Sequence, residues 1–293
     1  MLTFSFISQI IVDGLIAGSI YMLLAIGLTL VFGVLGIANF AHGEFYMLGG
    51  YFGIIISTKF NFGFFESLLL VLFIIGIVAL LIDRLIFLPL KNQEMTNTII
   101  VSFGLSVMLQ NIALLVFGPE PQIFKTSWSS IPVEIGDIYL TLSRAIIPIF
   151  VISISFIMFI VLKYTWSGRA LQALSQNTMI AELCGINIDK IAIITFMIGA
   201  IFAGFAGILM SSIFVVQPST GNMVVLKAFT VVILGGLGSI SGAAIAGLLL
   251  GIVEVFTAAL INNLAKDIVA FVIVIIMLMI RPQGLFGQKI GRV

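Results

Sequence analysis

Long apolar intervals separated by short polar stretches run along the whole chain. Because a helix needs roughly 20 mostly apolar residues to cross a bilayer and tolerates few ionised ones, the charge-poor intervals predict the spans. The predicted helices occupy residues 10–33, 45–58, 67–82 with an extension to 90, 96–117, 145–162, 191–216, 224–234, 241–260 and 268–280. The interval 224–234 has the length of a half-span, which gives eight full spans, or nine crossings if it counts. The pattern therefore predicts an all-α polytopic membrane protein with one transmembrane domain over 1–293.

Composition supports this class. Of the 293 residues, 61% are hydrophobic and 9% are charged, and the mean hydropathy of +1.30 far exceeds what a soluble core requires. The net charge of +1, with no basic run, gives no indication of nucleic-acid binding. The single cysteine, Cys184, excludes an internal disulfide and is interpreted as a packing residue. Residues 1–12 carry no charge and no cleavage-site pattern, so the first apolar segment is expected to be retained.

Most lysines and arginines lie in three connecting segments, which predicts the orientation because these residues favour the cytoplasmic side. The segments contain Arg84 and Lys91 (82–97), Lys163, Arg169 and Lys190 (163–190), and Arg281, Lys289 and Arg292 (after 280). The 118–144 loop carries three acids against Lys125 and Arg144 and is the best candidate for an extracytoplasmic loop. This assignment puts the N-terminus outside if the half-span crosses the membrane.

A polar break interrupts the first apolar region. Three polar residues, Asn39, His42 and Glu44, lie among the otherwise apolar or small residues of 27–51, and His42 is the only histidine of the chain. An ionised side chain at the bilayer centre costs about 2.5–3.5 kcal/mol on insertion scales, so such residues face a bundle interior or an aqueous path. The glycines around them suggest an interrupted helix, which is tolerated at that depth only where protein or cavity water satisfies the backbone. These residues therefore line or gate a path, cap broken helix ends, or do both.

A second break follows the half-span at Gly235, Gly236 and Gly238. The apolar sequence that begins at Phe229 and runs into this break parallels the one that begins at Leu28, 201 positions earlier. Two broken segments in corresponding halves indicate a transport path at a repeat interface. The alternatives are a chance similarity between glycine-rich spans and a purely packing role for the three glycines.

The remaining candidate residues form no recognisable catalytic or metal centre. Glu254 stands alone in an apolar helix and either faces a cavity, pairs with a cation such as Lys227, or is protonated. No Gly-x-x-x-x-Gly-Lys-Ser/Thr motif occurs, so that cradle for nucleotide phosphates is missing. His42 and Glu44, two positions apart, would point to different sides of a helix, which argues against a metal site. We therefore expect no catalytic residue, metal or cofactor. The enzymatic alternative is a membrane-embedded hydrolase with His42 as its general base, but the sequence shows no strained turn that would present a nucleophile to this histidine.

The segment 163–190 joins two spans but alternates small, polar and apolar residues. One face of a short helix can be formed by Ala170, Leu171, Leu174 and Ala181. Such a helix either inserts into a groove of a cytoplasmic partner or rests on lipid headgroups.

Several blocks, in order along nearly the whole chain, resemble the permease subunits of branched-chain amino acid ABC importers of the LivH type. The blocks are Ile37-Ala-Asn-Phe-Ala-His-Gly-Glu44, Gly168-Arg-Ala170, Ala181-Glu-Leu-Cys-Gly-Ile-Asn187, Thr195-Phe-Met-Ile-Gly-Ala-Ile-Phe-Ala-Gly-Phe-Ala-Gly207, Ile233-Leu-Gly-Gly-Leu-Gly-Ser-Ile-Ser-Gly-Ala-Ala-Ile-Ala-Gly247 with Glu254, and Arg281-Pro-Gln-Gly-Leu-Phe-Gly287. Gln172 and Asn177 stand where the family's coupling loop commonly has an arginine and an acid, so a less ionic partner contact is expected.

The resemblance implies an ATP-driven importer in the plasma membrane of a bacterium or archaeon. It would contain two related membrane subunits, of which this chain is one, two cytoplasmic ATPases and an extracytoplasmic substrate-binding protein. The chain itself would not be an enzyme, and its cargo would be leucine, isoleucine, valine or a related amino acid. The implied ATPase-contact residues are Gly168, Arg169, Ala170, Glu182 and Gly185. The implied residues of the translocation path or its helix breaks are Asn39, His42, Glu44, Gly235, Gly236, Gly238 and Glu254.

The main alternative is an ion-coupled secondary transporter or a channel for a small solute, including urea or short amides. Such a protein would use an intramembrane carboxylate for coupling, and Glu44 and Glu254 are the candidates. A receptor or structural protein is least favoured, because it would give no reason for two broken helices.

Overall fold

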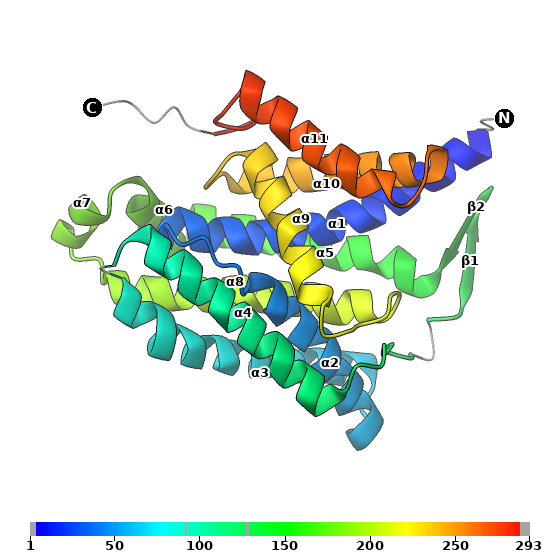
Figure 1. Cartoon of the computed structure of the whole chain (residues 1–293), viewed down its shortest axis with the longest axis horizontal. Coiled ribbons are helices and arrows are strands. Elements are labelled where there is room, and N and C mark those ends of the chain that lie inside the picture. The colour runs from blue at the N-terminus through cyan, green and yellow to red at the C-terminus, as the bar shows by residue number, and fades with distance from the viewer. Residues whose placement is uncertain (1–3, 92, 127–128, 288–293) are drawn as a thin grey trace.

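The computed structural model describes residues 4–91, 93–126 and 129–287, so Lys289 and Arg292 of the predicted cytoplasmic tail lie outside the described residues. The helices are α1 (Phe4–Leu35), α2 (His42–Phe60), α3 (Phe64–Ile82), α4 (Met95–Phe117), α5 (Leu142–Tyr164), α6 (Trp166–Gln176), α7 (Thr178–Leu183), α8 (Ile188–Ser211), α9 (Thr220–Gly235), α10 (Ile240–Leu260) and α11 (Ala265–Ile280). A hairpin of β1 (Pro132–Ile135) and β2 (Ile138–Thr141) precedes α5. The all-α membrane fold predicted from the sequence is confirmed (Figure 1).

Each predicted apolar segment forms a helix, although the bounds differ. In the described residues, six helices are long and apolar enough to cross a membrane: α1, α3 with its extension to Leu90, α4, α5, α8 and α10. The extension of α3 is a π-helical turn at Asp83–Phe87 followed by a 3-10 turn. The predicted half-span is α9, which has 16 residues. The segment predicted to reach 216 ends instead at Ser211, because Val216 forms an isolated β-bridge with Gln122.

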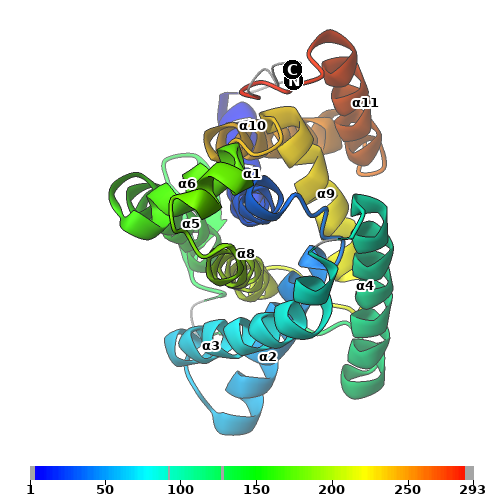
Figure 2. The ribbon, with the colours of Figure 1, turned by 90° about the vertical axis from the view of Figure 1, so that its left-hand side faces the viewer.

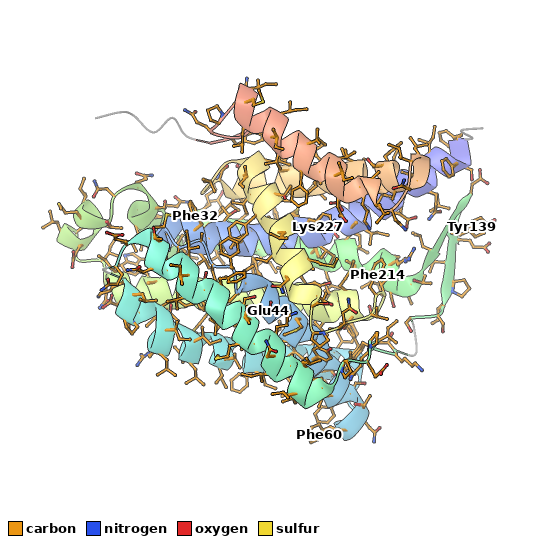
Figure 3. All side chains as sticks on the ribbon, in the orientation of Figure 1. Phe32, Glu44, Phe60, Tyr139, Phe214 and Lys227 are labelled. Atoms are coloured by element: carbon orange, nitrogen blue, oxygen red, sulfur yellow. The ribbon has the colours of Figure 1, made fainter. Side chains whose placement is uncertain are left out.

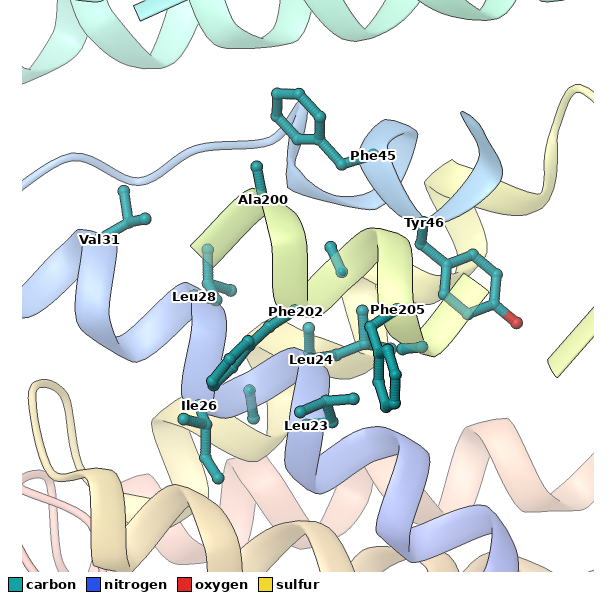
Figure 4. Packing of buried hydrophobic residues seen from close by; sticks show 14 of the residues in the cluster. Leu23, Leu24, Ile26, Leu28, Val31, Phe45, Tyr46, Ala200, Phe202 and Phe205 are labelled. Atoms are coloured by element: carbon teal, nitrogen blue, oxygen red, sulfur yellow. The ribbon is translucent and has the colours of Figure 1, made fainter. Parts of the chain in front are cut away.

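Helices α1 and α8 form the centre of the bundle (Figure 2). In the most apolar stretch of α1, 78% of the residues are buried, and in that of α8, 72% are buried. The corresponding value for α5 is 22%. Leu24 and Leu28 of α1 and Phe202 and Phe205 of α8 lie in one buried core (Figure 4), and Phe45 of α2 joins α8 through an edge-to-face contact with Phe196. The outer helices keep large apolar side chains exposed, as expected for a surface that faces lipid.

Glycines bring the central helices into direct backbone contact. A Cβ atom added at Gly49 of α2 would lie 2.6 Å from the Cα atom of Gly204 on α8, and one added at Gly14 of α1 would lie 2.7 Å from the Cα atom of Ile252 on α10. In a bilayer, close packing replaces the hydrophobic effect as the force that joins helices, so small residues at these contacts hold the bundle together.

The two ends of the bundle have different charges. The connection from α3 to α4, the α6–α7 segment and the described part of the tail lie at one end, and the N-terminus and the hairpin lie at the other (Figure 1). Lys91 Nζ lies 2.7 Å from Asp189 Oδ1 and joins two of the basic segments. At the opposite end, Gln9 exchanges hydrogen bonds with the backbone of Tyr139. Segments predicted to share a side of the membrane therefore lie at the same end of the bundle, and the end with the three basic segments is its positive end, which the charge rule predicts to be cytoplasmic.

The glycine contact between α2 and α8 predicts a specific sensitivity to added volume. We expect Gly49→Val to lower the free energy of unfolding by about 1–3 kcal/mol, because the extra atoms would overlap the backbone of Gly204. Thermal unfolding of the purified protein in detergent measures this change.

The matched control is Gly104→Ala on the exposed face of α4, where an added Cβ meets no atom within 4 Å. This variant should be unchanged or more stable by up to about 1 kcal/mol, because alanine favours the helix. Equal stability of Gly49→Val and the wild type would contradict the packing described here.

Candidate functional site

The first break, residues 36–41, leaves backbone groups that the bundle itself satisfies. Gly36 ends α1 with a φ of +66°, a conformation that glycine adopts without strain. Asn39 Oδ1 accepts a hydrogen bond from the N–H of Ala41 (3.0 Å), and Ser102 Oγ on α4 accepts one from the N–H of Phe40 (3.2 Å). The side chain of Asn39 thus satisfies a backbone N–H inside the break, although no side chain caps the start of α2.

His42 opens α2 and is completely enclosed. Its ring lies against α1, beside the backbone of Leu24 and against Gly27, where an added Cβ would come within 3.2 Å of the imidazole Cε1. The absence of a side chain at Gly27 thus makes room for the ring. Asn39 therefore contacts the break itself, whereas the ring of His42 packs on the interior of α1.

Glu44, one turn into α2, is fully buried in a polar cluster between α2, α4 and α9 (Figure 3). Ser106 Oγ on α4 donates to Glu44 Oε1 (2.8 Å) and also lies 3.1 Å from Asn222 Oδ1 on α9. Asn222 Nδ2 in turn donates to Gln110 Oε1 (3.0 Å). Glu44 Oε2 has no hydrogen-bond partner in the described part of the chain and lies at the first turn of α9, against Gly221.

Glu254 belongs to a second, fully compensated cluster. Lys227 Nζ on α9 lies 2.7 and 2.8 Å from its two carboxylate oxygens, and the hydroxyl of Tyr21 donates to Oε2 (2.7 Å). Lys227 also reaches Asp267 on α11 (2.9 Å) and lies 5.3 Å from the centre of the Tyr21 ring. Of the situations considered for Glu254, pairing with Lys227 is therefore the one observed. The cluster joins α1, α9, α10 and α11.

The second break, residues 236–239, is closed by the tail. Gly236 and Gly238 have φ angles of +104° and +83°, which explains the need for glycine at both positions. Gly235 touches the backbone at Gly242, so the ends of α9 and α10 pack without side chains between them. The N–H groups of Leu285 and Phe286 donate to the last carbonyls of α9, at 2.9 and 3.0 Å.

The 163–190 segment forms α6 and α7, which project from the positive end of the bundle (Figure 1). The four residues predicted to form one apolar face are all buried, but they belong to two helices: Ala170, Leu171 and Leu174 to α6, and Ala181 to α7. The other side of α7 exposes Met179, Ile180 and Leu183 at 72%, 59% and 83%.

The five residues proposed for partner contact divide into two groups. Gly168 and Ala170 are buried, and a Cβ at Gly168 would overlap the backbone of Val161 and Leu162, so these two residues fasten α6 to α5. Arg169, Glu182 and Gly185 are exposed. Gly185 has a φ of +81° and ends α7.

Several members of the two clusters could not be recognised from the sequence. Ser106 and Gln110 within α4 and Asn222 at the start of α9 are ordinary polar residues, far from Glu44 along the chain. Tyr21 and Asp267 likewise gave no signal. The one available indication was Lys227, an isolated cation within an apolar helix, which must find a partner.

Comparison with known proteins assigns the chain to a family. Residues 10–278 match the family described as "Branched-chain amino acid transport system / permease component". The chain is 35% identical to the high-affinity branched-chain amino acid transport system permease protein LivH of Salmonella typhimurium (strain LT2), over 97% of each chain. It is 25% identical to the permease protein LivM of the same organism, over 91% of this chain and 67% of LivM.

A solved structure, PsaBC from Streptococcus pneumoniae in complex with Fab, supports the fold. It superposes with a TM-score of 0.50 at 13% identity and covers 92% of this chain and 91% of the other. Because the match in sequence extends over nearly the entire length, the chain belongs to the family of permease components of branched-chain amino acid transport systems.

Proposed function

We propose that this chain forms one half of the translocation path of an ATP-driven importer for leucine, isoleucine and valine in the cell membrane. The match to LivH over 97% of both chains carries the proposal, since LivH is by name a permease of such amino acids. The whole chain serves as a single transmembrane permease domain. Hydrolysis of ATP takes place in partner subunits.

The second half of the path is a related, longer permease. The chain is similar to both LivH and LivM, which are named as permease proteins of one high-affinity transport system. The alignment covers only 67% of LivM, so the second relative is the longer one. Because two related permeases belong to one system, we infer that they pair side by side and that each contributes one face of the path.

The α6–α7 segment is the contact with a cytoplasmic ATPase. It lies at the positive end, where its inner face is fixed to the bundle and its outer face exposes Met179, Ile180 and Leu183 beside Arg169 and Glu182. An apolar patch on a short projecting helix suits insertion into a groove. The two departures from the family pattern have local roles: Gln172 Nε2 donates to the carbonyl of Leu162, and Asn177 caps α7 through the N–H of Ile180.

The path runs past the two helix breaks. The breaks approach each other, since a Cβ added at Gly33, near the end of α1, would lie 3.4 Å from the Cα atom of Gly238. We propose that Asn39, His42, Glu44, Gly235, Gly236, Gly238 and Glu254 line the path or hold its helix ends. A binding protein delivers the amino acid at the end that carries the N-terminus and the hairpin. Nucleotide binding then shifts the membrane halves between two states, which requires that the ATPases bind one state more tightly.

The contact with the ATPase predicts the effect of reversing an exposed charge. In the complete transporter reconstituted in liposomes, we expect Arg169→Glu to reduce the number of amino acids taken up per ATP hydrolysed about fivefold or more. Loss of a typical coupling free energy between two sites has an effect of this size. Parallel assays of uptake and phosphate release measure this ratio. Arg169 is preferable to Gly185 as a target, because valine at the positive φ of Gly185 would strain the end of α7.

The control is Lys59→Glu, which reverses an exposed charge in the last turn of α2, at the opposite end of the bundle. This variant should insert and couple as the wild type does. Unaltered coupling in Arg169→Glu would exclude the α6–α7 segment from the transmission of force.

The energy source separates the importer from an ion-coupled transporter. We expect the complete complex to accumulate labelled leucine only when ATP is present on the cytoplasmic side. Liposomes that contain this chain alone should accumulate no leucine under an imposed proton or sodium gradient. Gradient-driven accumulation by the isolated chain would show that it is a secondary transporter instead.

A further inference from the structure

The two glutamates buried inside the helix bundle are in opposite electrostatic situations. Glu254 is surrounded by compensating groups, with Lys227 bound to both of its oxygens. Glu44 is equally buried, but no cation is paired with it in the described part of the chain. Lys227 cannot serve both, because it is already held by Glu254 and Asp267.

The surroundings of Glu44 compensate a negative charge only in part. Ser106 donates one hydrogen bond, and the first turns of α2 and α9 lie beside the carboxylate. A helix N-terminus contributes roughly half of an elementary charge, spread over several N–H groups, and does not replace a cation. The carboxylate oxygen Oε2, buried and without a hydrogen-bond partner, marks the position where a donor is missing.

The cluster is rich in acceptor oxygens and leads to the surface. Besides the carboxylate of Glu44, it contains the side-chain oxygens of Ser106, Asn222 and Gln110 within one chain of hydrogen-bonding contacts. Asn222 and Gln110 are partly exposed on α9 and α4, whereas Glu44 and Ser106 are buried beneath them. A charged group with several N–H donors would therefore meet acceptors in sequence as it moved inward.

We propose that the carboxylate of Glu44 is the transient counter-charge for the α-ammonium group of the amino acid during its passage. The inference rests on the proposed function, which supplies a cargo with this group. The α-ammonium group and the α-carboxylate of the amino acid are costly to bring into an apolar path, because both are charged. The branched side chain is apolar and enters such a path readily. Ser106 orients the carboxylate through its hydroxyl, and the amide oxygen of Asn222 accepts a remaining ammonium N–H.

Movement of α4 gives access to this site. Only 28% of its most apolar stretch is buried, and it packs mainly against α2. Leu105, Leu109 and Ala113 give it a narrow apolar contact with the core, and three polar links add to this contact. They are Ser102 at the first break, Ser106 at Glu44 and Gln110 at Asn222. Separation of α4 from α9 would expose Glu44 without disturbing the packing of α1 on α8.

The first test uses the complete transporter in liposomes with Glu44→Gln, which keeps the shape of the side chain but removes its charge. We expect the maximal rate of ATP-dependent leucine uptake to fall about 30-fold or more, as when one partner of a buried, hydrogen-bonded charge pair is removed. The KM should change little, because the binding protein sets it. Glu44→Asp, which retains the charge, should recover part of the rate. The control Glu120→Gln, in an exposed loop, should transport as the wild type does.

The second test varies the ligand. Thermal unfolding of the wild-type membrane complex, without its binding protein, is followed in the presence of millimolar leucine, leucinamide or 4-methylpentanoate. Leucinamide retains the ammonium group and should raise the Tm as leucine does, whereas 4-methylpentanoate, which lacks it, should not. In Glu44→Gln the shift with leucine and leucinamide should disappear.

The outcomes separate the two proposals. A wild-type complex that imports leucine, together with an equally active Glu44→Gln variant, would overturn the role of Glu44 and leave the importer intact. Stabilisation by 4-methylpentanoate but not by leucinamide would overturn it as well. A wild-type complex that imports no branched-chain amino acid would overturn the proposed function, and the role of Glu44 with it.

Discussion

The structure depends on one constraint: every backbone group released by a broken helix must find a partner inside the protein, because lipid offers none. The chain breaks twice, after α1 and after α9. At the first break, the side chains of Asn39 and Ser102 bind the free N–H groups. At the second, the backbone of Leu285 and Phe286 binds the free carbonyls of α9. The short helices are stable in this setting because other parts of the chain complete their ends.

This constraint also explains where the glycines and charges lie. A break can be closed by backbone only if the backbones approach closely, so residues without side chains accumulate around both breaks, as at Gly33, Gly235 and Gly242. Polar groups that remain must be matched, and Glu254 with Lys227 is matched within the chain. Glu44 has no paired cation in the described part of the chain. Because a buried carboxylate without a counter-charge is costly, this arrangement agrees with the proposed passage of a cation beside it.

Sequence patterns predicted the helices and the breaks because both follow from local composition. The apolar intervals specified α4 to within a residue or two, and the glycines around Asn39 located the first break. Patterns that depend on distant contacts could not be predicted. The end of α8 at Ser211 depends on a bridge to Gln122, and the closure of α9 depends on residues some 50 positions later in the chain. The resemblance to a family supplied the importance of the 163–190 segment, but only the structure distinguished its anchoring residues, Gly168 and Ala170, from its exposed ones.

Helix α9 connects all of these features. Its first turn lies against Glu44, its middle carries Lys227, and its last carbonyls are bound by the tail. A displacement of α9 along its axis would therefore change the environment of the unmatched carboxylate, strain the ion pairs to α10 and α11, and pull on the tail. If this short helix of 16 residues shifts as a unit, the three changes occur together. This makes α9, rather than the long central helices, the element best suited to link the positive end of the bundle with the surroundings of Glu44.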